Sequence, residues 1–115
     1  MAEQWPRIQH GMELFNHGRY HESHEEFELA WRAAPRTERF FLQSLVHCAA
    51  AWHHAGRGNY EGAMLQARRA LRKLAGYLPE HGGVDTRRLS SLLLDWLDCW
   101  QRGVPAPRAT IGVRR

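Results

Sequence analysis

Hydrophobic residues recur with helical spacing through most of the chain, and glycine and proline residues divide this pattern into segments. We predict five helices. They cover residues 4–17, 20–33, 37–55, 59–77 and 85 to about 100, with Gly103 closing the last. No stretch alternates between apolar and polar residues for long enough to predict a strand. The pattern therefore predicts an all-α protein.

The third segment, residues 37–55, is apolar on nearly all sides, which is typical of a helix buried between neighbours. The other segments have one apolar face. Asn59 and Asp85 stand at the starts of the fourth and fifth segments, where their side chains are suited to cap a helix. We therefore expect the third helix at the centre of the fold.

The sequence repeats itself at an offset of 40 residues. Gly18-Arg19-Tyr20 aligns with Gly58-Asn59-Tyr60, and small residues align in the helices on both sides. This pattern resembles the second helix of a tetratricopeptide repeat. It predicts two helical hairpins, with a C-terminal capping helix that covers the apolar edge of the stack.

With 115 residues, of which 43% are hydrophobic and 24% charged, the chain has the size and composition of one globular domain. We assign the domain to residues 1–103. Residues 104–115 contain two prolines, three arginines and little apolar content, and we expect them to form a mobile basic tail.

Cys48 and Cys99 lie in no spacing that predicts a disulfide framework or a zinc site. They are interpreted as small hydrophobic residues in a reducing compartment. No apolar run approaches the roughly 20 residues that a membrane-spanning helix needs, and the first residues do not resemble a signal peptide. The expected location is the cytoplasm, without membrane contact.

Charge is distributed unevenly along the chain. Residues 1–35 carry three Arg and six Glu, a net −3, whereas residues 36–115 carry thirteen Arg or Lys and six Asp or Glu, a net +7. Such ends favour antiparallel association, so a homo-oligomer is one expected partner. The basic residues of the second half are Arg68, Arg69, Arg72, Lys73, Arg87, Arg88, Arg108, Arg114 and Arg115, among others. No nucleic-acid-binding motif accompanies them, and nucleic acid is not the expected ligand.

One stretch combines Tyr20-x-Glu22-x-His24-Glu25-x-x-Glu28-x-x-Trp31 with Phe41-Leu42-Gln43, Ala49-Ala50-Ala51, His53 and Gly58-Asn59-x-x-Gly62-Ala63. On these motifs, residues 11–75 resemble the domain of unknown function 309 family. The resemblance implies a small tetratricopeptide-like helical fold and no established activity, substrate or cofactor.

Histidine and glutamate gather in the second predicted helix. His24 and Glu28 form one pair at i,i+4 beside the apolar stripe, and His21 and Glu25 form another on the solvent side. A carboxylate at this spacing can share a metal with the imidazole or orient it. The run matches neither of the metal-binding patterns His-Glu-x-x-His and Glu-x-x-His.

In the third predicted helix, Gln43, His47 and His54 lie on one line, and the repeat alignment turns His47 and His54 toward the fourth helix. His53 is expected to face the second helix, where His24 or Glu28 is a suitable hydrogen-bond partner for His53 or Gln43. The candidate site therefore comprises His24, Glu25, Glu28, Gln43 and His53. Three interpretations are open: a buried hydrogen-bond network between the hairpins, a metal or catalytic site, and a site for a non-metal ligand.

No nucleophile elbow, phosphate-binding loop, dinucleotide fingerprint or kinase motif is present, so those enzyme classes are set aside. The leading hypothesis is an interaction module for a protein or peptide. The alternative is a metal-binding protein or metal-dependent hydrolase, whose cofactor would be a divalent metal; otherwise no cofactor is expected. The sequence does not decide whether the protein is an enzyme.

Overall fold

The computed structural model describes residues 2–113 and contains five α-helices within them. They are α1 (Trp5–Asn16), α2 (Tyr20–Arg32), α3 (Arg39–Gly56), α4 (Tyr60–Leu74) and α5 (Thr86–Gln101). The same residues contain two isolated β-bridges and no strand, which confirms the all-α prediction. None of the described helices is both long enough and apolar enough to cross a bilayer.

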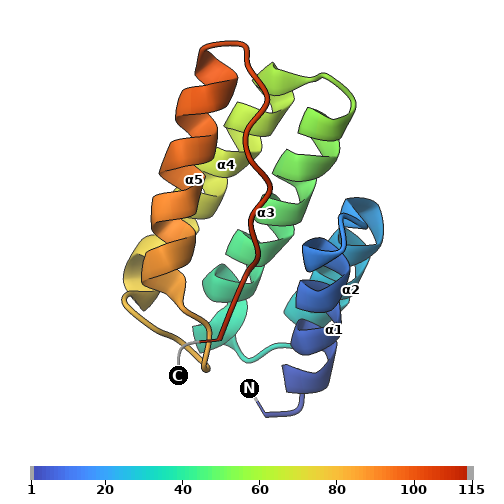
Figure 1. The fold of residues 1–115 in the computed structure, drawn as a ribbon. Helices are drawn as coiled ribbons and strands as arrows, with labels where there is room; N and C mark the ends of the chain where they lie inside the picture. Colours follow the sequence, from blue (N-terminus) through green and yellow to red (C-terminus); the bar gives the residue numbers. More distant parts are fainter. Residues whose placement is uncertain (1, 114–115) are drawn as a thin grey trace.

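The helices stack in chain order (Figure 1). α1 and α2 form the first hairpin, α3 and α4 the second, and α5 packs on α4. Because α3 packs against both α2 and α4, it is covered on two sides, and Phe41, Leu42 and Leu45 are fully buried. The predicted central position of this helix is confirmed, and so is the arrangement of two hairpins with a closing helix.

The turns of the two hairpins have the same geometry, as the 40-residue repeat predicts. After α1, the amide of Arg19 donates to the carbonyl of Leu14 at 2.9 Å, and after α3, Asn59 donates to His54 at the same distance. In both turns a glycine adopts a left-handed conformation, with φ of 79° at Gly18 and 74° at Gly58. These hydrogen bonds satisfy the last carbonyls of each helix and turn the chain back.

Two helix ends differ from the prediction. The predicted third helix starts in a short 3₁₀ turn, η1 (Arg36–Glu38), which precedes α3. The predicted fourth helix ends in another, η2 (Ala75–Tyr77), which follows α4. Pro35 lies immediately before the first turn and Pro79 follows the second, and 3₁₀ turns are common at such helix ends. The predicted caps are confirmed, because Asn59 accepts from the amide of Gly62 and Asp85 from that of Arg88.

Tryptophan side chains join α3 and α5. The ring centroid of Trp52 lies 5.2 Å from that of Trp96 and 5.5 Å from that of Trp100, and both pairs are edge-to-face. Edge-to-face contacts of this kind add to the stabilisation from apolar burial. All three side chains are at least nine-tenths buried, and Trp31 packs partly buried against the same core.

Both cysteines are free thiols, in agreement with the absence of a disulfide pattern. Cys48 is fully buried in α3 and Cys99 is half-buried in α5. Burial raises the pKa of the Cys48 thiol to about 12, because the thiolate is disfavoured away from water. Cys48 is therefore a packing residue rather than a nucleophile.

Residues 104–113 differ from the free tail that their composition predicts. They run back along the molecule in front of α3, between α1 and α5 (Figure 1). Ile111 is only 3% exposed, and Ala106 and Ala109 pack against the core. Pro105 and Pro107 prevent a helix, but an extended chain can still bury alternate side chains. Arg114 and Arg115, which belong to the predicted basic tail, lie outside the described residues.

Candidate functional site

The two predicted pairs on α2 are present. Nδ1 of His24 lies 3.8 Å from Oε2 of Glu28, and Nε2 of His21 lies 2.8 Å from Oε1 of Glu25. Glu28 also pairs with Arg32, one turn further along the helix. Surface pairs at this spacing contribute only tenths of a kcal/mol, so they do not by themselves mark a site.

The polar residues of α3 divide between its two neighbours. On the α4 side, Oε1 of Gln43 accepts a hydrogen bond of 2.7 Å from Nζ of Lys73. On the α2 side, the ring of His53 lies 5.4 Å from that of His21, centroid to centroid. The pKa of His53 is lowered by desolvation and by the neighbouring charges of His21, Arg57, His54 and His24. The predicted orientation of His53 is thus confirmed.

The five candidate residues do not converge. Gln43 faces α4, His53 stands beside His21, and neither bonds to His24 or Glu28 among the described residues. The physical reason is that α3 lies between α2 and α4, so residues on its opposite sides cannot share partners. Within residues 2–113 no group of three or more His, Cys, Asp or Glu side chains is arranged to hold a metal ion. In this part of the chain, the candidate residues therefore form neither the predicted hydrogen-bond network nor the predicted metal site.

Asn16 at the end of α1 makes two hydrogen bonds to the C-terminal segment. Its side-chain oxygen accepts from the amide of Ile111 at 2.8 Å, and its side-chain nitrogen donates to the carbonyl of the same residue at 3.1 Å. Both main-chain groups of one peptide residue are thus held by one carboxamide. These hydrogen bonds involve only main-chain atoms of Ile111, so they do not depend on which side chain is present at position 111.

Further contacts hold the same segment at α5. Arg88 donates to the carbonyl of Thr110, and the amide of Asp85 donates to the carbonyl of Gly112 at 3.0 Å. We call the surface that carries residues 104–113 the tail-binding face; it is formed by Asn16, Gly18, Trp52, Asp85, Arg88 and Trp100. It lies across α1, α3 and α5, which are the first helix of each hairpin and the closing helix.

A pocket of about 230 Å³ lies on the tail-binding face where residues 105–108 of the segment run. Tyr20, Trp52 and Trp100 are among its lining residues, and Pro105 and Ala106 of the C-terminal segment line it as well. The segment therefore forms one wall of a hollow that also contains aromatic side chains.

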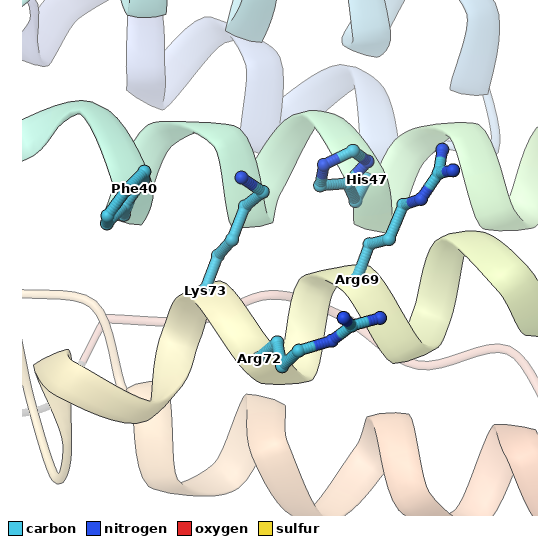
Figure 2. Close-up of a pocket in the computed structure, with 5 residues that line it drawn as sticks. All are labelled: Phe40, His47, Arg69, Arg72 and Lys73. Atoms are coloured by element: carbon cyan, nitrogen blue, oxygen red, sulfur yellow. The ribbon is translucent and has the colours of Figure 1, made fainter.

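A second pocket, of about 520 Å³, lies on the other side of α3, between α3 and α4 (Figure 2). We call it the basic pocket; it is lined by Phe40, His47, Arg69, Arg72 and Lys73. In Figure 2, Arg69 and Lys73 project from α4 toward α3, which carries Phe40 and His47, and Arg72 runs along α4. No carboxylate is among these lining residues.

Comparison with known protein families gives one match. A family model described as a domain of unknown function, DUF309, matches residues 8–65. The chain belongs to the domain of unknown function 309 family. The match covers most of α1, all of α2 and α3, and the first six residues of α4, which confirms the resemblance that the motifs of α2 and α3 indicate. No curated protein matches the chain. The part that this DUF309 chain adds beyond the match includes Arg69 and Lys73 of the basic pocket, α5 and the C-terminal segment.

Sequence reasoning missed Asn16 and Ile111. They are 95 positions apart, and no local pattern connects them. A signal was nevertheless present for the segment itself, since Ala109 and Ile111 are apolar residues two positions apart in a stretch without helical periodicity. For the basic pocket the signal was stronger, because Arg69 and Lys73 stand at i,i+4 on the helix that His47 was predicted to face.

Proposed function

We propose that this DUF309 protein is an interaction module that binds an extended peptide segment of a protein partner on the tail-binding face. In the isolated chain, residues 104–113 occupy that face and stand in for the partner. The observation that carries the proposal is the double hydrogen bond from the Asn16 carboxamide to the backbone of Ile111.

Backbone recognition of this kind supports peptide binding because an extended segment presents the same amide and carbonyl groups whatever its side chains are. Arg88 adds a donor to the carbonyl of Thr110. Stacked helical hairpins commonly bind ligands on extended surfaces formed by successive repeats. The tail-binding face is such a surface, since it crosses α1, α3 and α5.

Side-chain preference would come from the site of Ile111. This side chain is 3% exposed, and burying an aliphatic side chain of its size contributes about 1.5–3 kcal/mol. Ala106 and Ala109 are half-buried and also pack on the core, so small residues accompany the buried isoleucine in this segment. We therefore expect the partner segment to be extended, with a branched aliphatic residue two positions after a small one.

A partner must displace the chain's own segment. A segment tethered in this way acts at an effective concentration on the order of millimolar. A partner peptide added to the wild-type chain would therefore bind weakly. Removal of the side chain that anchors the tail would free the tail-binding face and show its intrinsic affinity for the peptide.

The test uses the full chain with the substitution Ile111→Asp, which places a carboxylate where the apolar side chain is buried and so releases the tail. A fluorescent peptide with the sequence of residues 104–113 is added, and its anisotropy is measured. We expect the variant to bind the peptide with a dissociation constant on the order of micromolar, and the wild type to bind it far more weakly.

Two controls make this result specific. The same peptide carrying Asp in place of its isoleucine should not bind, and the double variant Ile111→Asp with Asn16→Leu should lose most of the affinity because both hydrogen bonds to the isoleucine backbone are gone. A folded Ile111→Asp variant, verified by circular dichroism, that does not bind the peptide would disprove the proposal.

A further inference from the structure

Arg69, Arg72 and Lys73 carry three positive charges within little more than one turn of α4. None of the three forms an ion pair with any residue between positions 2 and 113, although several carboxylates of the chain do form such pairs elsewhere. Positive side chains placed this close repel one another, and an anion between them would relieve the repulsion. The charge arrangement therefore favours a ligand with more than one negative charge.

His47 lies at the α3 side of the same pocket. Its Nδ1 donates to Oε1 of Gln66 at 2.7 Å, which leaves Nε2 as the atom that can take up a proton. The pKa of His47 is lowered, first by desolvation and then by the charges of Lys73, Arg69 and His24; the hydrogen bond to Gln66 acts in the opposite direction. A bound anion would offset these charges and turn His47 into an additional donor.

Phe40 gives the pocket an apolar end. Its side chain is 59% exposed, and Nζ of Lys73 lies 4.9 Å from the ring centroid, so the ring and a cation stand next to each other. Lys73 is held there by its hydrogen bond to Gln43. The volume of about 520 Å³ is within the range of roughly 300–1,000 Å³ that is usual for small-molecule sites.

We propose that the basic pocket binds a small phosphorylated organic molecule, with its phosphoryl groups among Arg69, Lys73 and His47 and its organic part against Phe40. Arginine and lysine are the usual partners of phosphoryl oxygens. The site does not depend on the tail-binding face, because it lies between α3 and α4 on the other side of α3.

The arrangement fits a small molecule better than a nucleic acid. A nucleic-acid surface needs cations spread along the path of a backbone, whereas these three lie within little more than one turn and beside a hollow. Arg68, the neighbouring arginine of α4, is exposed and does not line the pocket. It provides a matched control, because its substitution removes an equal charge from the same helix.

The experiment is a titration of the full chain with inorganic pyrophosphate and, separately, with ADP at low ionic strength, followed by the imidazole NMR signals of His47. We expect saturable shifts and an increase in the pKa of His47 upon binding. Arg69→Gln should weaken binding of either probe by about tenfold or more, as expected for loss of a charge-assisted hydrogen bond, and Arg68→Gln should leave it nearly unchanged.

Comparison of ADP with pyrophosphate distinguishes a site for an organic phosphate from a site for an inorganic anion. If ADP binds more tightly than pyrophosphate and Phe40→Ala removes the difference, the organic part is located on Phe40 as proposed. Equal affinities would overturn that part and assign the pocket to an inorganic anion. The whole proposal is overturned if His47 does not respond to either probe, or if Arg68→Gln and Arg69→Gln weaken binding equally. A parallel titration with single-stranded RNA completes the test: binding of RNA but of neither probe would also overturn the proposal.

Discussion

Gly11 lies where α1 crosses α2, and the crossing depends on its lack of a side chain. A Cβ at this position would lie 2.6 Å from Cε1 of Phe27, whose ring is fully buried and cannot move aside. The hydroxyl of Ser23 donates to the Gly11 carbonyl at 2.8 Å, which fixes the same close approach. The small residues that align in the sequence repeat are thus explained by packing.

We expect Gly11→Ala to lower the free energy of unfolding by about 1 kcal/mol. Overpacking typically costs about 1–3 kcal/mol, which outweighs the gain of about 1 kcal/mol in helix propensity. The matched control is Gly56→Ala, because nothing lies within 4 Å of a Cβ there. Urea unfolding of both variants gives the answer, and a Gly11→Ala variant as stable as Gly56→Ala would contradict the proposed packing.

The lowered pKa of His47 predicts a contribution to acid sensitivity. Its pKa lies below the ordinary value of 6.5 in the folded chain, so near and below this pH the unfolded state binds the proton more readily. Stability from this group is complete above about pH 6.5 and decreases as the pH falls toward the folded-state pKa. In His47→Gln, the stability lost between about pH 7.5 and 5.5 should be smaller than in the wild type.

Thermal unfolding at several pH values measures this difference in the absence of phosphate or other multivalent anions. The control is His17→Gln, because His17 is exposed and lies outside the basic pocket. A His47→Gln variant with the same pH dependence as the wild type would show that the imidazole is not kept neutral by its surroundings.

At the scale of elements, the two hairpin turns are equivalent, so equivalent substitutions should have equal effects. A non-glycine residue in the left-handed conformation costs about 1–2 kcal/mol, and both Gly18 and Gly58 adopt it. The guanidinium of Arg108 lies near Gly18, but this flexible end can move away. We therefore expect Gly18→Ala and Gly58→Ala to lower the free energy of unfolding by similar amounts, about 1–2 kcal/mol each.

Gly76→Ala is the control for this pair, because Gly76 has neither a positive φ nor a neighbour within 4 Å of a Cβ. Urea unfolding of the three variants tests the equivalence. If either turn accepts alanine without loss, the two turns do not share the geometry that their repeated sequence indicates.

The helices could be predicted because each is encoded locally, by its apolar spacing and by the residues at its ends, such as the caps Asn59 and Asp85, the glycines Gly18 and Gly103, and Pro35 after α2. The C-terminal segment could not, because its position depends on contacts between residues far apart in the chain, above all Asn16 and Ile111. A composition of proline and arginine indicates only the absence of a helix. It does not indicate whether an extended chain finds a surface to bury its side chains.

The candidate site shows the same limit. The sequence places His53 toward α2 and His47 toward α4, and both orientations are confirmed by contacts with His21 and Gln66. Helical wheels order residues around one helix but do not give the distance across to the next. The expected bond from Gln43 to His24 or Glu28 is not formed, because Gln43 lies on the same side of α3 as His47 and accepts from Lys73 of α4.

At the scale of the whole molecule, the dispersed histidines and carboxylates predict that a metal ion does not stabilise the fold. A ligand that binds only the folded state raises the unfolding temperature, by an amount that grows with the logarithm of its concentration above the dissociation constant. We expect the chain to unfold at the same temperature with zinc as with a chelator. A clear increase with zinc that is absent in His24→Ala would instead support the metal-binding alternative.

The central claim is that the tail-binding face holds extended peptides and that residues 104–113 occupy it in competition with others. The most direct measurement is an NMR titration of the ¹⁵N-labelled wild-type chain with an unlabelled peptide of residues 104–113, taken well beyond the effective concentration of the tether, on the order of millimolar. We predict that the amide signal of Ile111 moves to the position of a free chain as the peptide replaces the labelled tail. An Ile111 signal that stays fixed throughout the titration would contradict the claim.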